Sequence, residues 1–199
     1  MKIYKAYKYR LYPNEEQEIL INKSIGSSRY IYNYFLNRKD EYYKDSKQNL
    51  SLKDMKLELV ELKDKLPWLQ EVDGLSLTNA LDNLDRGYTN YFAKKAAHPV
   101  FKKRGCHDSY QTKCIRSEYC GNYYDNIQVD LKNRTIKLPK LGIIPIRGYR
   151  NLDKKLNIRN ATVEKVGLKY YVSLCCEEEI NIIKPKIIHA VGIDLGVSS

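Results

Sequence analysis

The sequence predicts an α+β protein in which a helical bundle is inserted into a small antiparallel β-structure. Three observations support this prediction. Apolar residues recur every three or four positions between residues 14 and 97, the spacing typical of amphipathic helices. Short alternating runs separated by turn residues follow Pro99, and a similar run precedes the helices at residues 2–11. We therefore expect a small barrel or sandwich that the first strand helps to close.

The chain begins with an alternating segment and continues into a long helix. Residues 2–11 alternate in polarity and are rich in tyrosine, which is typical of a strand, and Pro13 ends it. Asn14 and Gln17 have the spacing of a capping box, which predicts that a helix starts here. Apolar residues then follow at helical spacing: Ile21, Ile25, Tyr32 and Phe35. We expect this helix to run to about Lys44.

Two further helices are predicted from the same signals. Ser51 and Asp54 repeat the capping pattern, and Pro67 stops the second helix. Its apolar stripe comprises Leu52, Met55, Leu59, Leu62 and Leu66. The third helix is predicted from about Leu77 to the residues before His98-Pro99. Its stripe comprises Leu81, Leu84, Tyr88 and Tyr91. Three amphipathic helices bury their stripes best against one another, so we expect a bundle.

The section after Pro99 predicts strands. The runs are "NIQVD", "TIKLP", "IIPI", "ATVEKV" and "KYYVSLCCEE". Gly167 lies between the last two runs, where a tight turn would join them into a hairpin.

The charge of the chain points to a polyanionic partner. The 199 residues include 35 Lys and Arg against 24 Asp and Glu, a formal net charge of +11. Nucleic acid is the first candidate for a protein this basic. The amino terminus lacks the apolar core of a signal peptide, and no apolar stretch is long enough to cross a bilayer. We expect a cytoplasmic, nucleoid-associated protein that does not bind membranes.

Two groups of residues are candidates for contacts to nucleic acid. Lys102, Lys103 and Arg104 are adjacent in "HPVFKKRG", directly after the third predicted helix. Adjacent cations neutralise phosphates and give salt-sensitive binding, although a solvated basic turn would have the same sequence. Thr78 and Asn79 lie on the predicted helix "LTNALDNLDRGYTNYF", together with Asn83 and Asn90. Asparagine can pair with adenine, but it is also an ordinary surface residue.

One acidic residue is a candidate catalytic and metal-binding group. Asp194 lies in the apolar run "KIIHAVGIDLGV", which predicts a strand buried on both faces. A carboxylate there needs a partner, and Mg²⁺ is a suitable one. Gly192 and Gly196 would let a phosphate backbone approach. An RNase H-type nuclease strand fits this pattern, as do the phosphate-binding strand of a sugar kinase or actin-like ATPase and a purely structural turn.

Cysteine and histidine spacing gives no support for a zinc site. Cys106, His107, Cys114 and Cys120 cluster in the sequence, but they lack the C-x₂-C pair of the usual zinc motifs. The five cysteines are an odd number, which favours free thiols in a reducing compartment.

Several blocks, in this order, resemble the TnpB family, the OrfB-type proteins of insertion sequences. They are "YKYRLYPNEEQ", "LTNALDNLDRGYTNYF", "HPVFKKRG", "IKLPKLGIIPIRGYR", "ATVEKVGLKYYVSLCCEEE" and "VGIDLGVSS". The resemblance implies an RNA-guided DNA endonuclease of transposable elements, which binds guide RNA and target DNA. It also implies that a helical recognition domain interrupts a β-barrel wedge domain, and that a RuvC-type nuclease domain using Mg²⁺ follows. Asp194 then corresponds to the first catalytic and metal-binding aspartate.

The resemblance divides the chain into three parts. Residues 1–13 and 98–183 are expected to form the wedge barrel, residues 14–97 the recognition domain, and residues 186–199 the first strand of a truncated nuclease domain. The later catalytic carboxylates and the zinc-binding CxxC pairs of the family are absent from the sequence. We therefore expect this polypeptide to bind nucleic acid without cleaving it.

A second departure from the family affects the interpretation. The family usually carries glutamine near Thr78 and Asn79, so the resemblance does not indicate which DNA motif this chain reads. The alternative to a nuclease is a stand-alone nucleic-acid-binding regulator that retains the binding lobes alone.

Overall fold

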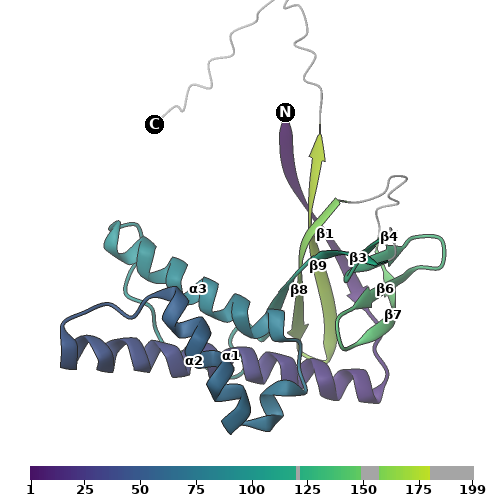
Figure 1. The fold of residues 1–199 in the computed structure, drawn as a ribbon. Helices are drawn as coiled ribbons and strands as arrows, with labels where there is room; N and C mark the ends of the chain where they lie inside the picture. The colour runs from purple at the N-terminus through teal and green to yellow at the C-terminus, as the bar shows by residue number, and fades with distance from the viewer. Residues whose placement is uncertain (120–121, 149–156, 180–199) are drawn as a thin grey trace, which may run out of the picture.

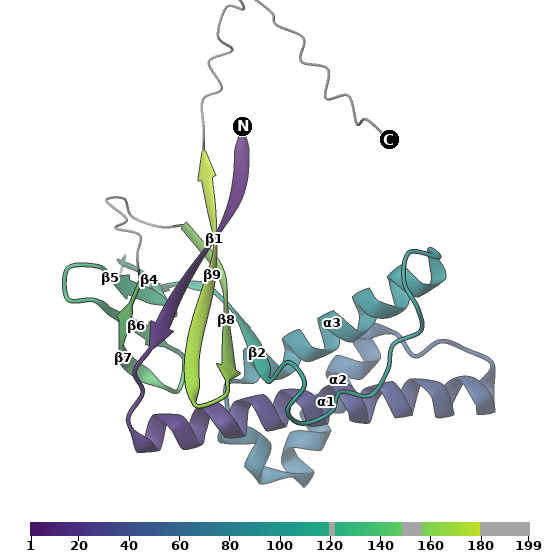
Figure 2. The same cartoon turned by 180° about the vertical axis from the view of Figure 1, so that it is seen from behind.

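A computed structural model describes residues 1–119, 122–148 and 157–179. Three long helices form one lobe, and a twisted sheet rises from one end of it (Figures 1 and 2). The chain enters through strand β1, passes through the helices, and returns to the sheet, as the sequence predicted. The helical elements are α1 (Glu15–Ser46), α2 (Leu52–Lys65), the short 3₁₀ helix η1 (Pro67–Gln70) and α3 (Gly74–Phe92).

Helix α1 begins at the predicted capping box. The Asn14 Oδ1 atom accepts a hydrogen bond from the Gln17 amide at 2.8 Å, and the Gln17 side chain accepts one from the Asn14 amide at 3.0 Å. Gln17 also donates to the carbonyls of Leu141 and Ile143. The cap therefore stabilises the helix end and ties α1 to the start of strand β7 (Gly142–Arg147) and the turn before it.

Helix α1 belongs to both hydrophobic cores of the molecule. Ile21 and Ile25 in its first half pack into the sheet core. Ile31 and Phe35, about two to four turns further on, pack into the core formed with α2 and α3. A single 32-residue helix therefore joins the two lobes.

Helix α3 begins three residues before its predicted start at about Leu77. Asp73 is its N-cap, and its Oδ1 atom accepts from the Leu75 amide at 3.1 Å. The other carboxylate oxygen accepts from the Thr112 hydroxyl, which lies on a strand of the sheet. This tertiary bond fixes the cap, so the apolar periodicity alone placed the helix start too late.

The main sheet has seven antiparallel strands in the order β2-β8-β9-β1-β7-β6-β5. Strand β1 is inside the sheet, paired with β9 over ten residues and with β7. The β8–β9 hairpin turns at Gly167 as predicted. The strands are β1 (Lys2–Leu11), β2 (Ser109–Lys113), β5 (Gln128–Asp130), β6 (Thr135–Leu138), β7 (Gly142–Arg147), β8 (Asn157–Val166) and β9 (Lys169–Glu179).

The prediction of a closed barrel is wrong. The edge strands β2 and β5 form no ladder with each other among the described residues. They approach at their ends, where Asn126 donates its amide to the Ile115 carbonyl at 3.1 Å. The chain between them instead forms a separate two-stranded sheet, β3 (Arg116–Tyr119) and β4 (Asn122–Asp125). Because this hairpin takes up the connecting residues, the main sheet curls around its core but stays open.

The β1–β9 pair carries a carboxylate held by several donors at the end where β1 begins and β9 ends. Glu177 lies on β9, and its side chain is 5% exposed. It accepts hydrogen bonds from Arg159 on β8. It also forms an ion pair with Lys2 on β1, whose Nζ atom lies 3.0 Å from the Glu177 Oε1 atom. Hydrogen bonds from Arg159, and then from Lys2, lower the pKa of Glu177 from 4.5 to about 2.

This arrangement predicts an acid-sensitive contribution to stability. A carboxyl group with a lowered pKa in the folded state stabilises the protein above its unfolded pKa, and this contribution is lost as pH falls toward the folded pKa. The stability difference between wild type and Glu177→Gln should therefore be largest near neutral pH and shrink between about pH 4.5 and pH 2. Urea unfolding of both proteins at several pH values measures it. A difference that is constant with pH would contradict the assigned pairing.

Candidate nucleic-acid interface

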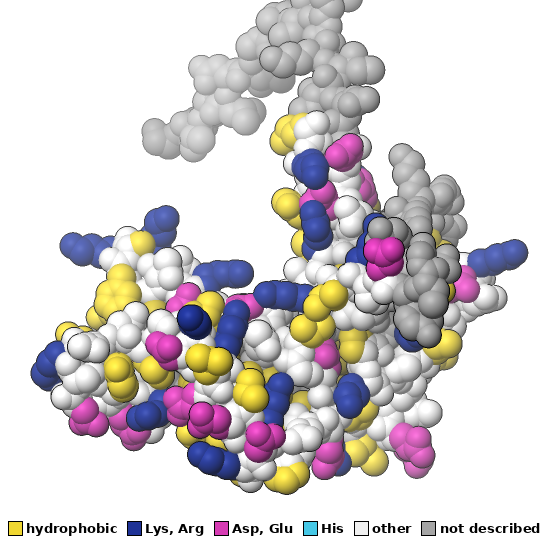
Figure 3. Space-filling view, viewed as in Figure 1, with side chains coloured by type: hydrophobic (Ala, Val, Ile, Leu, Met, Phe, Trp, Pro, Cys, Tyr) yellow, Lys and Arg dark blue, Asp and Glu magenta, His cyan; other side chains and the backbone are white. Residues whose placement is uncertain are grey.

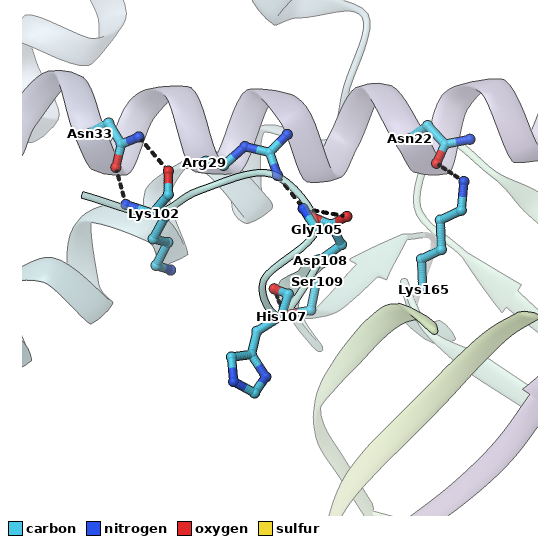
Figure 4. A network of polar contacts seen from close by, with 9 residues as sticks. All are labelled: Asn22, Arg29, Asn33, Lys102, Gly105, His107, Asp108, Ser109 and Lys165. Atoms are coloured by element: carbon cyan, nitrogen blue, oxygen red, sulfur yellow. Dashed lines mark hydrogen bonds and ion pairs between the residues drawn. The ribbon is translucent and has the colours of Figure 1, made fainter. Parts of the chain in front are cut away.

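The predicted basic run lies on the segment that connects α3 to β2, residues 98–108, called here the basic linker. Helix α1 holds this linker at two points (Figure 4). The Asn33 side chain accepts from the Lys102 amide at 2.8 Å and donates to the Lys102 carbonyl at 2.9 Å. One turn earlier, Arg29 donates to the Asp108 carboxylate at 2.7 Å. The linker is thus fixed on α1 where this helix passes between the two cores.

A tight turn shapes the linker between these two points. Gly105 has a φ of +81°, a conformation that glycine adopts without strain. Its amide donates to both carboxylate oxygens of Asp108, at 3.2 and 3.1 Å. These bonds close the turn directly after the cationic residues, and they keep the backbone of Lys103 and Arg104 at the surface.

The three predicted cations differ in their surroundings. The Lys102 ammonium lies 4.2 Å from the centre of the Tyr32 ring, a cation–π contact. Burial there lowers the pKa of Lys102, although much of the residue is exposed. Lys103 and Arg104 are exposed, and neither forms an ion pair with a carboxylate of the described residues. Their charges are therefore available to a partner.

Lys102 also lines an open pocket between the two lobes. The pocket has a volume of about 170 Å³ and lies between α1, α3 and β2. Asn83, one of the asparagines singled out on the third predicted helix, lines the same pocket. The pocket combines amide, hydroxyl and ammonium groups, which can hydrogen-bond to phosphate, sugar or base. Its full lining comprises Ser28, Ser76, Ala80, Asn83, Lys102, Ser109, Tyr110, Gln111 and Thr162.

The other two candidate residues, Thr78 and Asn79, do not line this pocket. The Thr78 hydroxyl donates to the Gly74 carbonyl of its own helix at 3.1 Å. Asn79 is 4% exposed, and its amide donates to Gln111 on β2 at 2.9 Å. Gln111 donates in turn to Asn160 on β8 at 3.1 Å. In this structure Asn79 ties α3 to the sheet, and the role predicted for both residues in DNA binding stays a prediction.

The surface charge is unevenly distributed. In the view of Figure 3, Lys and Arg side chains gather on the inner side of the corner between the helices and the sheet, while many Asp and Glu side chains lie along the opposite edge of the helical lobe. A polyanion would be attracted to the corner and repelled from the opposite edge.

The comparisons with known proteins cover the whole chain. A family model described as a helix-turn-helix domain of the OrfB proteins of IS605 elements matches residues 1–48. The chain is 31% identical over 200 residues to the protein named "Putative RNA-guided DNA endonuclease InsQ" of Escherichia coli K12. It is 28% identical over 203 residues to a "Putative RNA-guided DNA endonuclease" of Streptomyces pristinaespiralis. This chain belongs to the TnpB/OrfB family.

The TnpB/OrfB chain spans about half the length of the curated relatives it matches. All of it aligns with 46% of the Escherichia coli protein and 47% of the Streptomyces protein. A third relative, the "Virulence protein VsdF" of Salmonella dublin, is 32% identical over 111 residues, which are 50% of this chain and 93% of that protein.

The segment that the family model matches contains one strand and one helix. Residues 1–48 form β1 and the uninterrupted helix α1, and the next helix, α2, begins at Leu52. The two helices of a helix-turn-helix are therefore not both found in this segment of the TnpB/OrfB chain. The segment does include Arg29 and Asn33, the two residues that hold the basic linker.

The catalytic candidate of the TnpB/OrfB chain lies outside the described residues. Asp194 and the expected strand at residues 186–199 fall in the undescribed part. Among residues 1–119, 122–148 and 157–179, no three His, Cys, Asp or Glu side chains are grouped so that they could hold a metal ion. No helix among them is long and apolar enough to span a membrane.

Three residues that build this candidate interface were not singled out from the sequence: Arg29, Asn33 and Asp108. Arg29 and Asn33 are four residues apart, so they lie on the same side of α1. That spacing was the one available signal, and polar residues of a surface helix have it often. Their partners lie 69 to 79 residues away in the chain.

Proposed function

We propose that this chain is the nucleic-acid-binding portion of an RNA-guided DNA endonuclease. The observation that carries the proposal is the basic linker, which α1 clamps at the junction of the two cores with Lys103 and Arg104 facing solvent. Because the backbone of the linker is already held in place, its two exposed cations can contact successive phosphates without the linker first being ordered. The relatives named as RNA-guided DNA endonucleases support the same reading.

The three predicted parts then take distinct roles. Residues 14–97 act as the recognition domain, and residues 1–13 with 98–183 act as the wedge domain that supports it. Guide RNA and target DNA lie along the basic linker, where α1 holds it at the junction of the two cores. Thr78 and Asn79 belong to the helix that approaches the DNA. Asp194 belongs to the nuclease part, where it contributes one carboxylate to a Mg²⁺ site.

Binding measurements across a salt series test this proposal. The chain should bind a hairpin RNA and a DNA duplex with a log affinity that falls linearly with log salt between about 50 and about 200 mM. At moderate salt it should bind the hairpin RNA more tightly than heparin, because the polar pocket beside Lys102 adds contacts that charge alone does not give. Equal affinity for heparin and RNA would contradict recognition of a guide RNA.

A further inference from the structure

A second pocket lies on the other side of the basic linker. It has a volume of about 390 Å³ and lies between α1, the linker and the β8–β9 hairpin. Its lining comprises Asn22, Ile25, Arg29, Arg104, Asp108 and Lys165. Three of these six residues are cationic and one is anionic.

Hydrogen bonds from three elements hold the pocket in shape (Figure 4). The Lys165 amide donates to the Asp108 carbonyl at 2.8 Å, which fixes the hairpin to the linker. The Lys165 ammonium donates to the Asn22 side chain on α1 at 3.1 Å. Arg29 joins α1 to the linker through its ion pair with Asp108. Residues distant in the sequence therefore meet in a fixed arrangement.

The charges in the pocket are not balanced. Asp108 accepts from Arg29 and from the Gly105 amide, so both carboxylate oxygens are already engaged. Neither Arg104 nor Lys165 pairs with a carboxylate within the described ranges. The nearby Glu164 pairs with Lys8 on β1 instead. Arg104 and Lys165 thus face the pocket with two positive charges that Asp108 does not neutralise.

We propose that this pocket binds a phosphodiester group of the nucleic-acid backbone. The inference rests on the proposed function and adds a specific contact to it. A guanidinium can bind both non-bridging oxygens of a phosphodiester at once, and an ammonium on a flexible stem can share one of these oxygens. The Arg29 guanidinium, which donates to Asp108 through one nitrogen, supplies further N–H donors around the same space. Asp108 holds Arg29 and Gly105 in place, and Arg104 and Lys165 bind the phosphate.

Paired substitutions on the β8–β9 hairpin distinguish the loss of a contact in this pocket from the effect of a lower net charge. Lys165→Gln removes a cation that lines the pocket, whereas Lys169→Gln removes one from the same hairpin outside it. Both variants, Lys165→Arg and wild type are titrated with a hairpin RNA and a DNA duplex over a salt series. Thermal unfolding of each variant verifies that the fold is retained.

The Lys165→Gln slope of log affinity against log salt should be shallower than that of wild type by about 0.7 to 0.9, the loss of one phosphate contact. Lys169→Gln should leave the slope unchanged, and Lys165→Arg should keep most of the affinity because the positive charge remains. A loss confined to RNA would assign the phosphate to the guide, and a loss confined to DNA would assign it to the target.

Three results would overturn the inference. If the wild type binds and Lys165→Gln has the same salt slope, the pocket is not a binding site. The same follows if Lys165→Gln and Lys169→Gln lose equal affinity. Both results would leave the proposed function intact. A wild-type chain that binds neither polynucleotide would exclude both the pocket and the proposed function.

Discussion

Replacing Phe35 with alanine should lower the free energy of unfolding by about 3–5 kcal/mol. Phe35 is fully buried between α1, α2 and α3, among the largest side chains of the helical core. Its ring also meets the Tyr34 ring edge to face, with centres 5.1 Å apart. The substitution removes this burial and leaves a cavity that three long helices cannot easily close.

Urea unfolding followed by circular dichroism measures this effect. Phe92→Ala is the matched control, because Phe92 is 67% exposed at the end of α3. We expect that variant to lose no more than about 1 kcal/mol, since it gives up mainly ring contacts with Tyr88 and Tyr91. Equal losses for the two variants would contradict the described packing of the helical lobe.

Removing the two outward-facing cations of the basic linker should have the largest effect on binding. The double variant Lys103→Gln, Arg104→Gln should lose close to two phosphate contacts, so its salt slope should fall by about 1.4 to 1.8. At 0.1 M salt the affinity should fall by roughly one to two orders of magnitude. Neither side chain makes a described contact that the fold needs, so the unfolding temperature should change little.

A matched double variant on α2 controls for net charge. Lys53 and Lys65 are exposed on that helix, which contributes no residue to the two pockets beside the basic linker. Lys53→Gln, Lys65→Gln removes the same charge and should change the slope by much less. If both double variants weaken binding equally, the basic linker would have no special place in the interface.

The helices could be predicted because their signals are local. The capping box at Asn14 and Gln17 and the Ser51 cap both form as the spacing indicated. The start of α3 was placed too late because it was taken from the apolar stripe, whereas its N-cap, Asp73, lies four residues before Leu77 and also bonds to Thr112 of the sheet. A bond between residues 39 apart leaves no periodic trace in the sequence.

Fewer elements of the sheet could be predicted from the sequence. The β8–β9 hairpin and β1 were predicted from alternation and turn residues, yet β2, β3 and β4 were missed. "SYQTK", "RSEY" and "NYYD" are short and polar, and β2 is a strand because it pairs with β8 and packs under α3. The number of predicted strands also does not determine whether the edge strands pair, and β2 and β5 form no ladder with each other among the described residues.

The sequence by itself determined a basic chain with three amphipathic helices, a β-hairpin at Gly167 and a run of three adjacent cations. The tertiary structure alone decided which of those cations is available. Lys102 turns onto Tyr32, while Lys103 and Arg104 stay outside, because Asn33 and Arg29 anchor the linker from a distant helix. Charge and periodicity are properties of neighbouring residues, whereas a binding surface depends on which distant segments pack together.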